Sequence, residues 1–210
     1  MRIDSYPLDL VNGIRRYAMS EVPTLAIEDV VIIENSSLVY DEVIAHRLGL
    51  IPLRTPKKYL EAGQAQLMFV LDASADNATR TVYSGDLVSV EDKEVRPISN
   101  EIPIIKLAPK QNVKLEAYAR LGKGKQHSKY SPTSKSVSGG ELKVKNRYAC
   151  TFCEECLKVD RESIQISEEP NSYILSIESI GQLEAKDIVL ESVNLMIKDF
   201  DEFERRVDEI

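Results

Sequence analysis

The chain has 210 residues, of which 43% are hydrophobic and 29% are charged, with 9 glycines and 9 prolines. This composition is typical of globular proteins and excludes collagen-like, low-complexity and wholly disordered chains. A chain of this length buries roughly 70% of the surface that it exposes when unfolded, so we expect a substantial core. The start carries Arg2 and Asp4, and no run of about 18 uncharged apolar residues occurs, so we expect neither a signal peptide nor a membrane span.

The net charge of −7 is unevenly distributed along the chain. Eleven Lys or Arg stand against two carboxylates from Lys106 to Arg147, whereas sixteen Asp or Glu stand against six Lys or Arg from Glu154 to Ile210. Two solvated surfaces of opposite sign are the ordinary interpretation. The alternative is a nucleic-acid patch beside an acidic half that faces a partner.

The N-terminal third predicts two helices with a strand between them. Apolar residues recur every three or four positions in Pro7–Val22, which predicts an amphipathic helix that ends before Pro23. The β-branched residues of Ala26–Glu34 predict a strand. A second helix is expected at Val39–Leu48, where Gly49 follows it.

Short runs rich in β-branched and aromatic residues follow, and they predict the antiparallel strands of a smaller β-rich unit. They are Gln66–Asp72, Arg80–Ser84, Asp86–Val90, Ile102–Leu107 and Val113–Leu121. The next segment, Lys123–Gly140, is rich in Gly, Ser and Lys and has no apolar period, so we expect a loop or linker there.

The C-terminal part predicts a hairpin and a long helix. Ser163–Ser167 and Tyr173–Ser179 alternate as strands do, and Pro170 with Asn171 would form the turn between them. In Ala185–Val207 apolar residues repeat every three or four positions and form a narrow apolar stripe. Such a stripe favours packing against another helix, which could be the Pro7–Val22 helix, a helix of a second chain, or both. An ordinary core helix is the alternative.

No motif of a known catalytic centre occurs in the chain. Neither of the two histidines, His46 and His127, is followed by a metal ligand three to five residues later, and we expect His46 to be a structural hydrogen-bonding residue. The patterns of nucleophile elbows, phosphate-binding loops, zinc proteases and dinucleotide-binding folds are absent. We therefore expect the chain to have no active site of its own.

The one chemically specific pattern is a C-x2-C-x2-C run made of Cys150, Cys153 and Cys156. Three cysteines so close together favour a reduced, cytoplasmic chain over disulfide bonds. The spacing is that of iron–sulfur ligands in bacterial ferredoxins, but Asp160 stands where the next cysteine of that motif would be. The run could hold a [3Fe–4S] cluster, a labile [4Fe–4S] cluster with an outside oxygen ligand, or no cluster at all. A closed zinc site fits less well, because it normally takes four ligands.

Several strings that together span nearly the whole chain share the pattern of one known family. They are Asn12–Arg16, Ser20–Val30, Asn35–Ser37, Asp41–Leu53, Ile102–Ile104, Ala119–Gly124 and His127–Pro132. Through these strings the chain resembles the α-like assembly subunits of DNA-directed RNA polymerase. The cysteine run is absent from bacterial α subunits, so it points to the archaeal branch of the family.

The resemblance implies an α+β fold in which an α-like dimerisation domain is interrupted by an inserted β-rich domain. We expect the dimerisation domain at 1–39 and 161–210, the insert at 40–135 and a reduced, ferredoxin-like iron–sulfur segment at 136–160. The resemblance further implies a non-catalytic platform within a nucleotidyltransferase complex. Such a platform pairs with the small subunit L, and this heterodimer recruits the small subunits N and P before the two large catalytic subunits join. It touches no membrane and makes no sequence-specific contact with nucleic acid.

Two alternatives explain parts of the sequence. A small iron–sulfur electron-transfer or redox-sensing protein would explain the cysteines, but it would need four good ligands and would not need the long terminal helix. A nucleic-acid-binding module would explain the basic stretch. That stretch has few aromatic residues for base stacking, which are Tyr118 and Tyr130, with Tyr148 just beyond. The assembly subunit is therefore our prediction.

Overall fold

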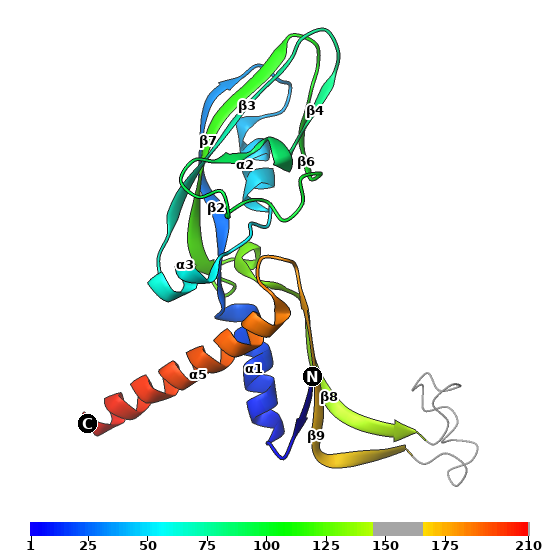
Figure 1. The fold of residues 1–210 in the computed structure, drawn as a ribbon, viewed down its shortest axis with the longest axis vertical. Coiled ribbons are helices and arrows are strands. Elements are labelled where there is room, and N and C mark those ends of the chain that lie inside the picture. The colour runs from blue at the N-terminus through cyan, green and yellow to red at the C-terminus, as the bar shows by residue number, and fades with distance from the viewer. Residues whose placement is uncertain (145–165, 210) are drawn as a thin grey trace.

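The structure is a computed structural model, and it describes residues 1–144 and 166–209. Two parts are evident in Figure 1, a larger sheet-rich part and a smaller part in which two helices cross beside a ribbon of strands. Every strand pairing in the described ranges is antiparallel, which is consistent with the predicted α+β class. None of the described helices is long and apolar enough to cross a membrane.

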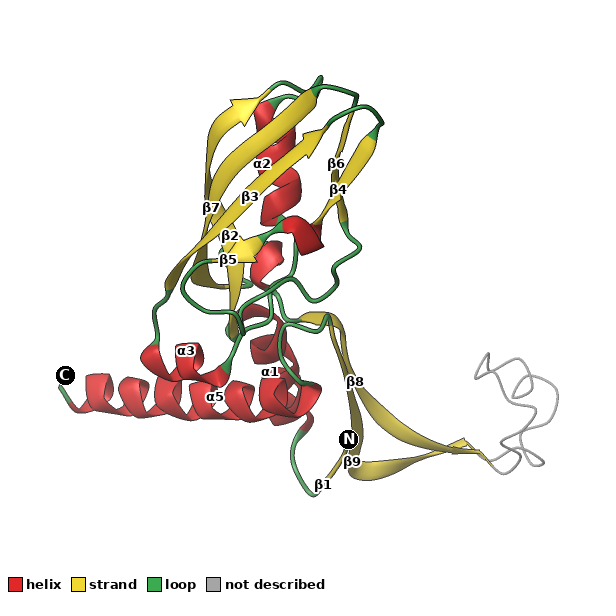
Figure 2. Ribbon diagram, turned by 45° about the horizontal axis from the view of Figure 1, so that its top comes forward, coloured by secondary structure: helices red, strands yellow, loops and turns green. Residues whose placement is uncertain are grey.

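The larger part is built on a four-stranded sheet with the strand order β2-β7-β3-β5. Its strands are β2 (Pro23–Asn35), β3 (Gln66–Ala75), β5 (Val88–Ser89) and β7 (Gln111–Lys123). A two-stranded ribbon of β4 (Arg80–Tyr83) and β6 (Pro103–Leu107) lies opposite, and α2 (Asp41–Gly49) lies between the two (Figure 2). Successive residues of a strand face opposite sides, so alternate residues of β3 and β7 enter one core with α2.

Two short elements complete this part. The helix α3 (Lys57–Ala62) ends at Gly63, whose φ of +70° is the left-handed conformation that glycine adopts readily at helix ends. Single turns of 3-10 helix occur at Ser84–Asp86 and Ser128–Tyr130. The sequence predicted neither α3 nor these turns, because each is too short to show a hydrophobic period.

The smaller part consists of a three-stranded sheet and two crossing helices. The sheet has the order β1-β9-β8, with β1 (Arg2–Asp4), β8 (Thr133–Val144) and β9 (Ile166–Ser179). The helices α1 (Leu8–Ser20) and α5 (Ala185–Asp208) pack on it and on each other. Their joint core includes Val11, Ile14, Leu175 and Met196.

The principal helices and strands confirm the sequence predictions. Pro7–Val22 forms α1, Val39–Leu48 forms α2 and Ala185–Val207 forms α5. The predicted strands of the first 121 residues appear as β2 to β7, with their ends shifted by a few residues. Strong local periodicity is the reason for this agreement, since it specifies which residues face the core.

The predicted loop Lys123–Gly140 is wrong from residue 133 onward, because β8 begins at Thr133. This segment pairs with β9 through backbone hydrogen bonds, which need no apolar side chains. Its serines bind α1 instead: Ser136 Oγ donates to the Arg15 carbonyl oxygen (3.2 Å), and Ser138 Oγ donates to Asn12 Oδ1 (2.6 Å).

The predicted hairpin turn at Pro170 and Asn171 is also wrong, because β9 runs without a break from Ile166 to Ser179. The β8–β9 register shifts between the Gly140–Tyr173 pair and the Leu142–Glu168 pair, so Pro170 and Asn171 fall in an irregularity of the ladder. Proline has no N–H to donate, and it is tolerated there because the regular ladder is interrupted. The start of the predicted strand Ser163–Ser167 lies outside the described residues.

The predicted division into a dimerisation domain (1–39 and 161–210), an insert (40–135) and an iron–sulfur segment (136–160) stays a prediction. β2 belongs to the predicted 1–39 segment, yet it pairs with β7, and its Leu25 and Ile27 lie in the core of the larger part.

Asp92 anchors α3 to the loop before β6. Its carboxylate accepts from Lys58 Nζ (2.7 Å), from the Glu94 backbone N–H (2.9 Å) and from the Tyr59 hydroxyl (2.8 Å). The Lys58 interaction above all, then the other two donors, lowers the pKa of Asp92 to about 2.

We expect Asp92→Asn to lower the stability at pH 7 by on the order of 1 kcal/mol, since solvent weakens a partly exposed ion pair. A depressed carboxyl pKa adds stability above the pKa of the unfolded chain, and this is lost as the pH falls through about 2. The difference in unfolding free energy between variant and wild type, measured by urea unfolding, should therefore shrink as the pH falls below 5. Asp76→Asn is the control, because the Asp76 side chain makes no hydrogen bond or ion pair within the described ranges. A difference in unfolding free energy that stays constant with pH would contradict the stabilising role of the ionised Asp92.

Candidate protein–protein interface

The apolar stripe of α5 is buried in its first half and exposed in its second. Ile188, Ser192 and Met196 are buried against α1 and its neighbours. Beyond them the large apolar side chains face solvent, with exposed fractions from 51% to 65%. They are Ile197, Phe200, Phe203 and Val207, and Leu190 on the first half of the helix is 52% exposed.

The exposed half of α5 extends away from the rest of the chain. At 1.5 Å per residue a helix of 24 residues is about 36 Å long, and Figure 1 shows its C-terminal end projecting past α1. Two phenylalanines that are 64% and 65% exposed on such a helix form an apolar patch of the kind that marks protein interaction sites. The helix therefore continues its apolar stripe where the described part of the chain has nothing to cover it.

An apolar hollow of about 510 Å³ adjoins this patch. It lies between the N-terminal segment, α1 and α5, and its lining includes Ile3, Tyr6, Leu10, Val193 and Phe200. Phe200 belongs to both features, so they form one continuous area. We call the exposed residues of α5 and this hollow together the α1–α5 surface.

An exposed polar contact also joins the two helices. The Tyr17 hydroxyl donates to Asp199 Oδ2 (2.8 Å), and that carboxylate raises the pKa of Tyr17. Gly13 allows the close approach on the apolar side, because a Cβ there would lie 2.9 Å from the Met196 Cε. The crossing of α1 and α5 is thus defined by contacts within this chain, and the exposed stripe is presented on a preformed frame.

The predicted metal ligands Cys150, Cys153 and Cys156 lie outside the described residues, so their arrangement stays a prediction. Within the described ranges, no group of three or more His, Cys, Asp or Glu could hold a metal ion. His127 accepts the Lys129 backbone N–H at Nδ1 (3.1 Å), and His46 is exposed on α2.

Five cations of the basic stretch form ion pairs with acidic residues of the same chain. Lys123 and Lys125 both contact Glu21, each at 3.0 Å. Three further ion pairs join Arg120 to Asp29, Lys129 to Glu28 and Lys114 to Asp72. These partners lie outside the acidic C-terminal half, so the pairing does not test the two interpretations of the charge asymmetry.

The sequence missed the N-terminal residues that line the hollow. Ile3 belongs to a strand of three residues and Tyr6 to the turn after it, and such short elements carry no recognisable period. The three-stranded sheet of the described part thus carries two helices with an exposed apolar stripe, a feature typical of proteins that bind other proteins. The comparisons with known proteins give this class a family.

A model of the RNA polymerase Rpb3/RpoA insert domain matches residues 30–149. The chain is 36% identical to DNA-directed RNA polymerase subunit Rpo3 of Pyrobaculum islandicum, over 95% of this chain and 86% of the relative. It is 35% identical to subunit Rpo3 of Pyrococcus furiosus, over 93% of this chain and 87% of the relative. The chain is 32% identical to subunit Rpo3 of Pyrobaculum aerophilum, over 94% of this chain and 87% of the relative. The chain belongs to this family of RNA polymerase subunits, as the strings of its sequence predicted.

Proposed function

We propose that the chain is a non-catalytic assembly subunit of DNA-directed RNA polymerase and that its α1–α5 surface pairs with the small α-like subunit L. The observation that supports this most is the exposed stripe of α5, with Phe200 and Phe203 nearly two-thirds uncovered. Helices of a second chain can bury such an exposed apolar stripe, because the side-chain ridges of one helix pack into the grooves of another. The polymerase names of the relatives are in keeping with such a partner.

The further steps of assembly follow from the family resemblance. We propose that the heterodimer then recruits the small subunits N and P, and after them the two large catalytic subunits, in the cytoplasm. The alternative of a small electron-transfer or redox-sensing protein has no support from the comparisons, whose matches are polymerase subunits. It would also leave the exposed helix without a role.

The test is co-expression of the full chain with the small α-like subunit L. We expect a stable 1:1 complex in size-exclusion chromatography with light scattering. A chain that remains a monodisperse monomer in the presence of this subunit at micromolar concentration would contradict the proposal.

For the cysteine run we propose a structural, non-catalytic role. Three thiolates with no fourth cysteine in the chain suit a [3Fe–4S] cluster or a labile [4Fe–4S] cluster better than zinc. Cys150, Cys153 and Cys156 would be the ligands, and binding would contribute folding free energy to their segment.

We expect anaerobic reconstitution to yield iron and sulfide at the ratio of a cluster, with loss of iron on exposure to air. Iron and sulfide analysis with electron paramagnetic resonance measures this, and Cys153→Ser is the variant that should not reconstitute. A four-iron cluster that survives air would contradict the labile assignment. If no iron binds at all, the run is only a remnant of the motif.

A further inference from the structure

Two arginines stand opposite each other at the joint between the two parts of the chain. Leu53 and Pro97 form an isolated antiparallel bridge, and the Arg54 backbone N–H donates to the Arg96 carbonyl oxygen (2.8 Å). This register places Arg54 directly across from Arg96, so their Cβ atoms lie about 5 Å apart on one face. Like charges in directly opposite positions destabilise such a pairing.

Neither arginine forms an ion pair in the described part of the chain, although Glu94 lines the smaller hollow together with both of them. Most other cations near the joint are paired: Lys57 contacts Asp187 (2.7 Å), and Lys58 contacts Asp92 (2.7 Å) and Glu94 (3.4 Å). Arg54 and Arg96 form no such ion pair, although the chain has a net charge of −7. Two like charges thus lie opposite each other in a chain that has more carboxylates than cations.

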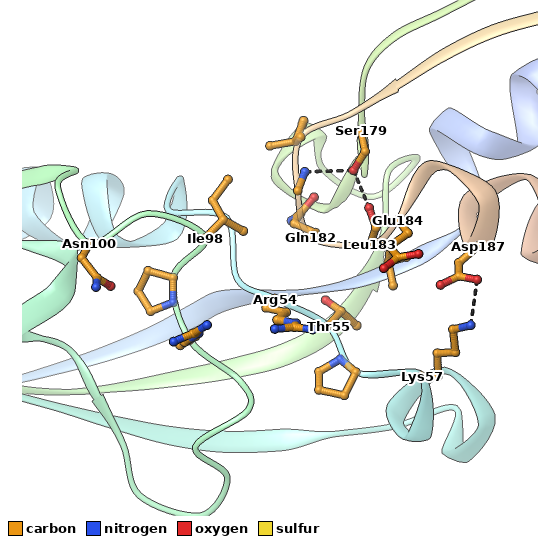
Figure 3. Close-up of a pocket in the computed structure, with 15 residues that line it drawn as sticks. Arg54, Thr55, Lys57, Ile98, Asn100, Ser179, Gln182, Leu183, Glu184 and Asp187 are labelled. Carbon is orange, nitrogen blue, oxygen red and sulfur yellow. Dashed lines mark hydrogen bonds and ion pairs between the residues drawn. The ribbon is translucent and has the colours of Figure 1, made fainter.

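The two arginines separate two hollows. The larger one, of about 760 Å³, lies toward the start of α5, and the smaller one, of about 310 Å³, lies toward residues 93–96. Figure 3 shows the larger hollow with Arg54 between Ile98 and the Lys57–Asp187 pair. Both hollows include Arg54 and Arg96 in their walls, so an extended segment could run past both guanidinium groups.

Hydrogen bonds between distant segments hold the floor of the larger hollow. The buried Thr55 donates its backbone N–H to the Gln182 carbonyl oxygen (2.9 Å), and its Oγ1 accepts the Leu25 N–H (3.0 Å). Apolar surface is also available beside the charges, since Ile98 is 38% and Ile180 36% exposed. A site whose backbone is already ordered loses little conformational entropy when it binds.

These features favour an acidic peptide over a nucleic acid. Arginine recognises carboxylates with paired hydrogen bonds, and the isoleucines offer contacts for apolar side chains next to them. A nucleic acid needs several cations along its backbone and aromatic side chains for stacking. No aromatic residue of the described ranges lines either hollow, so neither hollow offers a stacking surface for a base.

We propose that Arg54 and Arg96 bind an extended acidic segment of another polymerase subunit, through its Asp or Glu side chains. The inference rests on the proposed function, because it takes its partner from the same assembly. The site lies apart from the α1–α5 surface, since none of the residues that line the apolar hollow of that surface lines these two. The two interactions can therefore be tested separately.

The decisive variant is Arg96→Glu. It places a carboxylate opposite Arg54, so the melting temperature should stay at the wild-type value or rise. Binding of the heterodimer with subunit L to the remaining purified polymerase subunits should weaken about tenfold and depend less on salt. Lys106→Glu on β6 is the matched control, because it makes the same charge change at an exposed position outside both hollows.

A second measurement identifies the occupant. In the Arg54→Lys variant, a carbodiimide should couple Lys Nζ to an Asp or Glu of another subunit in the assembled complex, as mass spectrometry would show. Unchanged binding by Arg96→Glu, coupling only within this chain, or assembly that nuclease treatment abolishes would each overturn the inference. If even the wild-type chain fails to pair with subunit L, the proposed function falls and this inference falls with it.

Discussion

Phe200→Asp is expected to abolish pairing with the small α-like subunit while leaving the chain folded. Phe200 is 64% exposed in the chain alone, so the fold does not depend on its burial. In a complex it would be covered, and an unpaired carboxylate buried at an interface costs several kcal/mol. A loss of about 3 kcal/mol weakens binding more than a hundredfold. Isothermal titration calorimetry measures the affinity, and circular dichroism with thermal melting checks the fold.

The control for this variant is Arg205→Asp, which places the same side chain on α5. Arg205 follows Phe200 by five residues, which at 100° per residue puts it on the far side of the helix. Leu195 is a poorer position for a test, because it is partly buried beside Ala18 and Ile188 and its substitution would disturb the core. If Phe200→Asp pairs with near wild-type affinity, the exposed stripe is not the interface.

Gly124→Ala is expected to destabilise the chain by about 3 kcal/mol, the upper range for an overpacked site. A Cβ at Gly124 would lie 2.0 Å from the Met19 carbonyl oxygen, which is backbone and part of α1. The neighbouring Lys125 N–H donates to the Ser20 carbonyl oxygen (3.0 Å), so the two segments cannot separate without loss of this bond. Urea unfolding at pH 7 measures the difference.

Gly139→Ala is the matched control, since no atom of the described residues lies within 4 Å of a Cβ at that position in β8. We expect it to change the stability by less than about 0.5 kcal/mol. Equal effects of the two substitutions would show that the contact between Gly124 and α1 is not tight. A normal unfolding free energy for Gly124→Ala would show the same.

The segment around Gly124 illustrates a limit of local sequence patterns. Leu121–Lys125 alternates two glycines with two lysines, which is typical of a flexible basic loop. In the structure it is the end of β7 and the turn after it, which meet α1 and the Tyr130 ring. A Cβ at Gly122 would lie 2.5 Å from the Tyr130 Cζ, so the glycines allow close contact. No property of these five residues alone distinguishes the two uses.

The sequence by itself determined the elements with long, regular periods and the family. The repeat in Ala185–Val207 specified both the helix and the stripe that needs a partner, because side chains three or four positions apart share a face. The alternation in Val113–Leu121 specified which residues of β7 enter the core. The sequence strings shared with the family indicated the kind of assembly to which the chain belongs, which hydrophobic periodicity alone does not reveal.

Only the tertiary structure decided which half of that stripe stays uncovered, because the answer depends on how far α1 extends along α5. It also turned Thr133–Val144 into a strand, since a backbone ladder with β9 can form without an apolar pattern. The pairing of Arg54 with Arg96 depends on the bridge between Leu53 and Pro97, which are distant in the chain. Contacts between distant segments set all three results, and local preference carries no information about such contacts.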